Sequence, residues 1–259
     1  MILRRLKAHV EKENWFAVGI DFCIVVIGVF IGIQVANWNE TRSEVQRERV
    51  MLGELRGELE RAIHITEGRI DAFRQVSDSG RRSLAFLESD RECGDDCWPV
   101  LIDFFHASQW QTTAVPRGIF EEMRRGGLPS SRDIVDAVTS YHQRNDTLLV
   151  TGSVLPDYRS LVRERIPIDV QEAYWRDCYA VQEGREVLSM DCPEQVPPYV
   201  SRRTIEAIRA EPSIPLKLTE WIGFVVAFPQ DLQQEIDLAV AAIAEINREL
   251  ERLEQSSAA

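Results

Sequence analysis

Apolar residues dominate residues 16–38, directly after a basic tail at residues 1–15. Before Asn37 at its end, only Asp21 and Gln34 interrupt this run with strongly polar side chains. A helix of roughly 23 residues measures about 34 Å, which is enough to cross the hydrocarbon core of a bilayer. The pattern therefore predicts an uncleaved transmembrane helix at residues 16–38. The expected anchors at its two membrane interfaces are Trp15 and Trp38.

Residues 39–88 carry a helical period of apolar positions. The predicted seam consists of Val45, Leu52, Leu55, Leu59, Ala62, Thr66, Arg69, Phe73 and Val76. No proline precedes Trp98, so nothing in the sequence interrupts a helix between the span and this seam. We therefore expect the transmembrane helix to continue as a helical stalk to about Leu87.

The C-terminal segment at residues 229–255 shows the most regular period in the chain. Its seam consists of Leu232, Ile236, Ala239, Ile243, Ile246, Leu250 and Leu253. A long helix with one apolar seam must bury it, as coiled-coil helices do. We expect this helix to pack antiparallel along Val45–Phe73; self-association of either helix across two chains is the alternative. Residues 256–259 are expected to be a disordered end.

The middle region, residues 89–228, predicts several short helices joined by loops. The expected helices are Val100–Trp110, Pro116–Arg125, one capped by Ser130 or Ser131, Val154–Arg165, Asp169–Tyr179 and a buried helix end at Trp221–Phe228. The proline-rich stretch Cys192–Tyr199 must be a loop, and no set of alternating strands is evident. The sequence thus predicts an all-α protein with one extracytoplasmic domain at residues 39–255.

Charge and cysteine content suggest a compartment. Four basic residues in the tail place the N-terminus in the cytoplasm by the positive-inside rule, although arginines after the span make this bias small. The net charge of −12 disfavours nucleic acid as a partner. We expect a bacterial inner-membrane protein with a single span and a periplasmic C-terminal domain.

Four cysteines lie outside the span, an even number that suits an oxidising compartment: Cys93, Cys97, Cys178 and Cys192. Three pairings are possible, and Cys93–Cys97 with Cys178–Cys192 close the shortest loops. Four reduced thiols in a cytosolic domain are the alternative. The acidic tract Asp90–Cys97 could instead bind zinc or calcium, but its C-x3-C spacing lacks a second matching pair.

One face of the predicted span carries small and polar residues. Gly28 and Gly32 form a G-x-x-x-G pattern, which lets helix backbones approach closely in lipid. The face consists of Asp21, Val25, Gly28, Gly32 and Val35. It suggests a contact with a second copy or with another membrane protein. The alternatives are that the glycines are placed by chance, and that Asp21 lies near the cytoplasmic headgroups and stays hydrated.

Catalytic signatures are missing from the sequence. It contains no G-x-S-x-G, H-E-x-x-H, Walker A or G-x-G-x-x-G pattern. Of the four histidines, only His106 and His142 could meet in the core, and a lone helical histidine is more often structural. The sequence therefore predicts no enzyme and no cofactor.

The N-terminal block resembles an uncharacterised bacterial family of single-span membrane proteins, known only as a domain of unknown function. The features that carry the resemblance are Asp21, Gly28, Gln34 and the exit Ala36-Asn37-Trp38-Asn39-Glu40, where the family commonly has N-N-W-N-E. A looser match lies in the middle of the chain, where the family has a small-Gly-hydrophobic break before a helix that ends in Tyr-Tyr; this chain has Gly126-Gly127-Leu128 and then Tyr141-His142. The resemblance implies a membrane anchor and a helical outer domain, and it brings no known activity.

These patterns favour a membrane-anchored interaction or scaffold protein of the cell envelope. Its expected partners are the lipid bilayer and a protein that meets the span, either a second copy or another membrane protein. The alternative is a periplasmic module that senses a small ligand among the middle helices and signals through a partner.

Overall fold

The computed structural model describes residues 15–89, 91–94, 96–111, 114–153, 155–182, 185–189 and 191–258. The chain divides into two compact units, Met1–Met51 and Leu52–Ala259. Because 77% of the residues are helical and only 3% lie in strands, the all-α fold class predicted from the sequence is confirmed.

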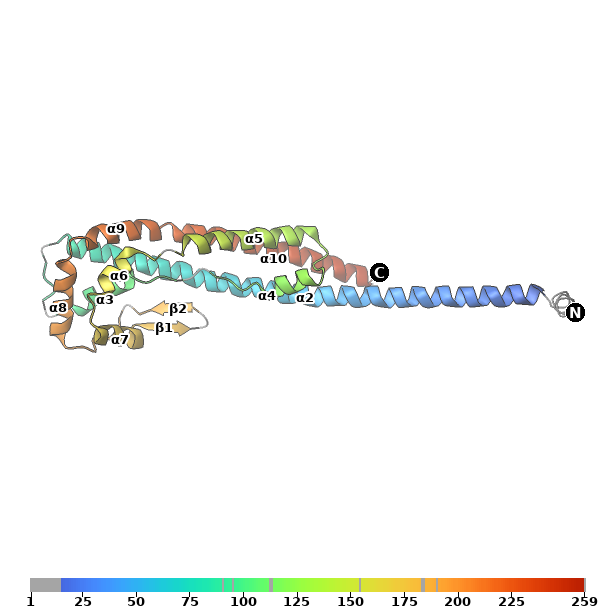
Figure 1. Cartoon of the computed structure of the whole chain (residues 1–259), viewed down its shortest axis with the longest axis horizontal. Coiled ribbons are helices and arrows are strands. Elements are labelled where there is room, and N and C mark those ends of the chain that lie inside the picture. Colours follow the sequence, from blue (N-terminus) through green and yellow to red (C-terminus); the bar gives the residue numbers. More distant parts are fainter. Residues whose placement is uncertain are drawn as a thin grey trace, which may run out of the picture. The chain divides into compact units, whose positions relative to one another are not determined.

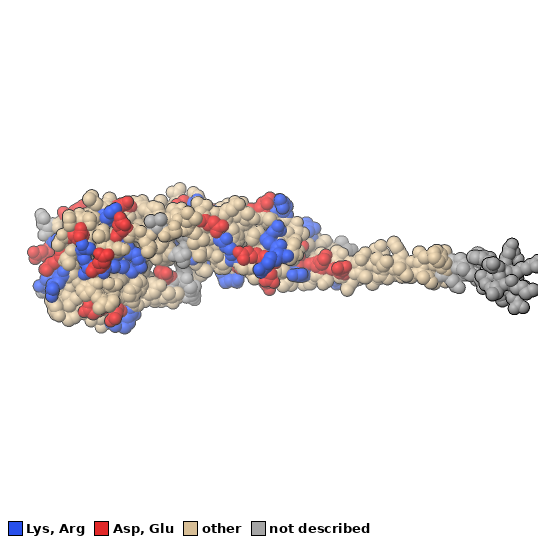
Figure 2. All heavy atoms as spheres, viewed as in Figure 1, with Lys and Arg blue, Asp and Glu red and all other residues tan. Residues whose placement is uncertain are grey.

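The longest element is α2 (Trp15–Leu87), an unbroken helix of 73 residues (Figure 1). It ends at the residue expected from the sequence, because no proline interrupts it and the helical period stops there. The described side chains of its apolar stretch, residues 22–38, are all exposed, and Figure 2 shows no Lys, Arg, Asp or Glu colour on the visible face of these residues. Among the described residues, α2 is the one helix long and apolar enough to cross a membrane.

The second unit is built on three long helices: the part of α2 from Leu52 onward, α5 (Arg132–Thr151) and α10 (Phe228–Ala258). The rings of Phe73 and Phe228 have centroids 5.1 Å apart, and Arg56 donates a hydrogen bond to Asn247 at 3.2 Å. Residue numbers rise along α10 as they fall along α2, so the predicted antiparallel pairing is confirmed. The packing of α5 along α10, visible in Figure 1, was not predicted.

The C-terminal helix is longer than expected. It continues through Ala258, so residues 256–258 are helical and the predicted disordered end is wrong there. Ser256 extends the last turn, because its hydroxyl donates to the carbonyl of Leu253 at 3.0 Å. Ala259 lies outside the described residues.

Short helices fill the middle of the chain. They are α3 (Trp98–Ala107), α4 (Gly118–Arg125), α6 (Asp157–Arg163), α7 (Ile168–Asp177), α8 (Pro198–Arg209) and α9 (Ile214–Val225). Of these, α3, α6, α7 and α8 gather at the end of the bundle where α2 ends, whereas α4 lies beside the opposite end (Figure 1). Contacts join α3 to α8 and α6 to α9. Helix α8 had no counterpart in the sequence prediction.

Two predicted helix starts differ in detail. Helix α4 begins at Gly118 after Arg117, not at Pro116, and ends at a glycine pair where Gly127 adopts a positive φ of 77°. The Leu128 amide then bonds the Met123 carbonyl at 2.8 Å, which completes the expected C-cap. Helix α5 does follow Ser131, but the hydroxyl of Ser131 makes no capping hydrogen bond.

A β-hairpin is the only strand structure among the described residues. Strand β1 (Tyr179–Gln182) pairs antiparallel with β2 (Arg185–Leu188). The strands are four residues each, too short for an alternating pattern to stand out in the sequence. The bond between Cys178 and Cys192 encloses the hairpin and holds its base together.

Aromatic side chains fill much of the core at this end of the unit. We call one set the aromatic cluster: Phe105, Tyr174, Trp175 and Tyr179. Phe105 stacks on Tyr174 with ring centroids 3.8 Å apart, and the guanidinium of Arg163 lies 4.7 Å from the centre of the Phe105 ring. The hydroxyl of Tyr174 accepts a hydrogen bond from Gln109 at 2.9 Å, so burial of this polar atom is compensated.

Candidate functional site

The predicted interaction face of the apolar helix is open in the first unit. Val25 is 62% exposed and Val35 is 57% exposed. A Cβ atom placed on Gly28 or on Gly32 would meet no other atom within 4 Å. The small-residue groove therefore has no partner within the described part of this chain, and a helix or lipid can approach it.

The polar ends of the predicted span are described in part. Trp38 is 64% exposed, and the guanidinium of Arg42 lies 5.6 Å from the centre of its ring. This pair combines an aromatic belt residue with a cation, as expected at a membrane surface. The side chains of Trp15 and Asp21 lie outside the described residues, so their predicted roles stay predictions.

Both predicted disulfides are present in the second unit. Cys93 and Cys97 are bonded across a short loop, and Cys178 and Cys192 are bonded across the hairpin. The Trp98 indole donates to the carbonyl of Cys192 at 2.9 Å, which ties the two disulfide regions together. Their loop lengths were the sequence signal that identified this pairing.

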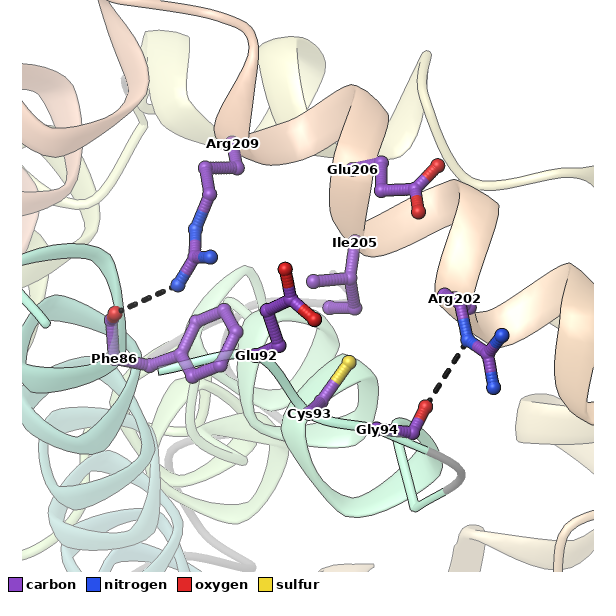
Figure 3. A pocket seen from close by; sticks show the side chains of 8 residues that line it. All are labelled: Phe86, Glu92, Cys93, Gly94, Arg202, Ile205, Glu206 and Arg209. Carbon is purple, nitrogen blue, oxygen red and sulfur yellow. Dashed lines mark hydrogen bonds between the residues drawn. The ribbon is translucent and has the colours of Figure 1, made fainter. Parts of the chain in front are cut away.

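A cavity of about 290 Å³ lies beside the first disulfide (Figure 3). It is lined by the end of α2, the loop that follows it and one face of α8, through Phe86, Glu92, Cys93, Gly94, Arg202, Ile205, Glu206 and Arg209. Figure 3 shows the sulfur of Cys93 pointing into the space that Glu92 and Ile205 border. Such a volume is at the low end for a small-molecule site.

Two arginines of α8 hold this loop. Arg209 donates through Nη2 to the carbonyls of Phe86, Ser89 and Arg91 at 3.2, 3.3 and 2.8 Å, and its guanidinium lies 4.4 Å from the centre of the Phe86 ring. Arg202 donates through Nε to the carbonyl of Gly94 at 3.1 Å. Both arginines therefore act as clamps that fix the loop, and both line the cavity.

Buried polar side chains, three of them ionisable, meet between α2, α5 and α10. We call this set the polar cluster: Arg69, Tyr141, Asn145 and Glu235. Glu235 is 0% exposed, and its Oε1 accepts from Asn145 at 3.2 Å. Burial raises the pKa of Glu235 to about 7, although Arg69 opposes this shift. Burial also lowers the pKa of Arg69, whose Nη2 donates to the carbonyl of Ala114 at 2.5 Å.

The polar cluster is incompletely paired. Within the described part of the chain, Arg69 Nη1, the Tyr141 hydroxyl and Glu235 Oε2 are buried without a hydrogen-bond partner. Burial is the main reason that the pKa of Tyr141 is raised, and the Glu235 carboxylate adds to it. Because Glu235 has no exposed surface, it can control helix packing but cannot touch a solute unless the helices move.

The two candidate histidines are not brought together. His106 is fully buried with its ring 5.3 Å from that of Tyr174, and burial lowers its pKa to about 4. His142 stacks on Phe120 with centroids 5.5 Å apart. In the described ranges no three His, Cys, Asp or Glu side chains form a metal-binding group; Asp90 and Asp95 of the acidic tract lie outside those ranges.

Sequence reasoning missed the clamps and the polar cluster. Arg202 and Arg209 carry no signal, because exposed arginines on an amphipathic helix are ordinary. Arg69 did carry one, since it occupies a position of the predicted apolar seam. A charge at a seam position indicates a buried polar partner, here on α5 and α10.

The resemblance of the N-terminal block to a family of single-span proteins stays a prediction. The two blocks that carry it lie in α2 and around the end of α4. Comparison with known proteins adds nothing to it, because no protein-family model, curated protein or solved structure matches this chain.

Proposed function

We propose that this chain is a single-span protein of the bacterial inner membrane that acts as an interaction or scaffold protein. In this proposal residues 16–38 cross the bilayer, the tail is cytoplasmic and the disulfide-bonded helical domain is periplasmic. The apolar stretch of α2 supports a membrane anchor, because its large apolar side chains are exposed and must be covered by lipid or protein. The two disulfides support an oxidising compartment.

The observation that carries the interaction role is the open face at Gly28 and Gly32. Lipid tails cover any apolar helix, so exposure alone does not indicate a protein partner. A groove of two glycines one turn apart does favour one, since it lets a second backbone approach closely. The partner is a second copy of this chain or another membrane protein.

Site-specific photocrosslinking in native membranes tests this role. A photoreactive residue at Gly28 should capture a protein adduct, whereas the same residue at Phe30, on the opposite face of the helix, should capture mainly lipid. The adduct at Gly28 should disappear when Gly32 is replaced by Ile, and should persist in the Val26→Phe control. Equal protein capture at the two positions, or none at either, contradicts the interaction face.

The orientation has its own test. A reporter enzyme that is active only after export, fused after Ala259, should be active, and a cytosolic reporter at the same position should be silent. The reverse result contradicts a periplasmic domain and would require the cysteines to be oxidised elsewhere. The reporter fusions test only the orientation of the chain, and the crosslinking experiment tests only the interaction face, so either prediction can fail without the other.

A second candidate is a module that senses a small ligand. A cavity of about 370 Å³ between α9 and the segment that joins α5 to α6 favours it, because Leu155, Trp221 and Phe224 give this cavity an apolar lining. Lys217 closes one side and pairs with Asp157 and Glu220 at 3.0 Å each. A rise in melting temperature with one compound of a metabolite panel, abolished by Trp221→Ala, would favour sensing over scaffolding.

A further inference from the structure

The two disulfides of the second unit differ in their surroundings. Cys178 is 0% exposed and Cys192 is 8% exposed, so solvent barely reaches either sulfur of this bond. In the other bond Cys97 is 1% exposed, but Cys93 is only partly buried and lines the cavity of Figure 3. One of the four bonded sulfurs therefore faces a space that a small molecule can enter.

Charged side chains of both signs surround that space. Arg202 and Arg209 line the cavity, and their guanidinium groups clamp the loop. Glu92 and Glu206 border it as well and reduce the attraction of the arginines for an anion. A thiolate is the attacking species in disulfide exchange, so these four side chains set how readily it reaches Cys93.

The position of Cys97 makes its sulfur the better leaving group. Cys97 is the N-cap residue of α3, and its carbonyl accepts the first helical bond from Leu101 at 3.0 Å. A thiolate at a helix N-terminus is stabilised by the helix dipole, and a stabilised thiolate leaves faster. Attack at the cavity-facing Cys93 therefore releases the thiolate that the fold stabilises.

We propose that the Cys93–Cys97 bond is a thiol–disulfide exchange site that opens in the folded protein, by attack of a small thiol on Cys93. The incoming thiolate forms a new bond to the Cys93 sulfur, and the bond to Cys97 breaks with its electron pair on the Cys97 sulfur. A second thiolate then attacks the sulfur of the first thiol, which leaves Cys93 reduced and the small thiol oxidised. The two electrons come from the two thiol molecules.

The fold can tolerate this opening. The loop between α2 and α3 remains tied to α8 by the contacts of Arg209 with Phe86, Ser89 and Arg91. The two cysteines are only four residues apart in sequence, so the bond closes a short loop. Opening the bond therefore gives the unfolded chain little additional conformational entropy. The Cys178–Cys192 bond, by contrast, closes the hairpin and is buried with it.

Partial reduction of the full chain in detergent micelles tests the proposal. The protein is exposed to reduced glutathione at neutral pH, quenched with acid and alkylating reagent, and mapped by mass spectrometry. We expect Cys93–Cys97 to open at least tenfold faster than Cys178–Cys192, with the glutathione adduct on Cys93 and an unchanged helical circular dichroism signal. Equal rates, an adduct mainly on Cys97, or opening only with loss of helix would each overturn it.

A variant that changes the charge of the cavity tests whether the thiol attacks through it. Glu206 is exposed, lines the cavity and has no described partner, so Glu206→Gln should leave folding intact. Removing its charge should speed attack by anionic glutathione roughly two- to threefold at low salt, and less at high salt. The matched control is Glu172→Gln on the exposed surface of α7, which should leave the rate unchanged. An equal effect of the two variants would place the attack outside the cavity and overturn the proposal.

Discussion

The aromatic cluster and the polar cluster lie in one unit and differ in what they bury: mainly aromatic rings in the first, and ionisable side chains in the second. Both regions hold some buried polar atoms without a described partner, and beside the aromatic cluster these are the ring nitrogens of His106 and Nη2 of Arg163. At the end of the unit that contains the aromatic cluster, which we call the aromatic end, two buried donors are paired. The hydroxyl of Tyr158 donates to the carbonyl of Phe104 at 3.0 Å, and the Trp221 indole donates to the carbonyl of Ala107 at 2.7 Å. In the polar cluster, Tyr141 and Glu235 keep buried atoms without described partners. Stability at the first site therefore comes from apolar burial, whereas stability at the second depends on charge state.

The largest expected effect is in the aromatic cluster. Phe105→Ala removes a fully buried ring that stacks on Tyr174 and lies beneath Arg163. Phenylalanine-to-alanine changes in cores cost about 3–5 kcal/mol, and chemical denaturation followed by circular dichroism will measure the loss. The control is Leu216→Ala, which removes a side chain that is 75% exposed and should cost under about 0.5 kcal/mol. Similar losses for both would contradict the aromatic cluster as the main source of stability.

The polar cluster should respond to single and double changes differently. Arg69→Met removes the cation that most strongly opposes the raised pKa of Glu235, and it should cost about 2–4 kcal/mol at pH 8. The double variant Arg69→Met with Glu235→Leu removes both charges and should recover most of that loss. Double-mutant cycles in denaturant measure the coupling. Additive losses would show that the two charges act independently.

The pH dependence of stability separates the two clusters further. The pKa of Glu235 is raised from 4.5 in the unfolded chain to about 7, so the folded protein binds an extra proton between these values. Its contribution is therefore fully present below pH 4.5 and is lost as the pH rises through 7. The shift from 4.5 to about 7 corresponds to roughly 3–4 kcal/mol over the whole range.

Glu235→Gln isolates this contribution, because glutamine does not titrate. Denaturant midpoints at pH 5 and pH 8 should show the wild type losing more stability across this interval than the variant. Phe105→Ala, which leaves Glu235 in place, should lose as much as the wild type over the same interval. If the wild type and Glu235→Gln have the same slope, Glu235 is ionised in the folded protein.

The long helices were predictable and much of their packing was not. The seams of α2 and α10 have a simple period because each faces an apolar neighbour along most of its length. Helix α5 packs on α10 partly through Asn145, a residue whose polarity hides its inward position in the sequence. The hairpin was missed because its strands are short and its closure depends on a disulfide between distant residues.

The candidate sites show the same division. Cysteine spacing predicted both bonds, and glycine spacing predicted the open face of the apolar helix. The cavity beside Cys93 could not be predicted, since Arg202 and Arg209 reach its loop from more than a hundred residues away. Local pattern identifies what an element can do, whereas only the tertiary fold decides which distant side chains surround it.

The smallest expected effect concerns how helices begin at the two ends of the unit. Ser131 precedes α5 in the bundle and makes no capping bond, so Ser131→Ala should cost under about 0.5 kcal/mol, less than a typical N-cap. Ser213 precedes α9 at the aromatic end, and its hydroxyl donates to Glu211 at 2.6 Å. Ser213→Ala should therefore destabilise measurably more than Ser131→Ala in parallel denaturant titrations. The opposite order would mean that the Ser131 hydroxyl caps α5 in solution, and that the bundle end depends on local polar contacts as much as the aromatic end does.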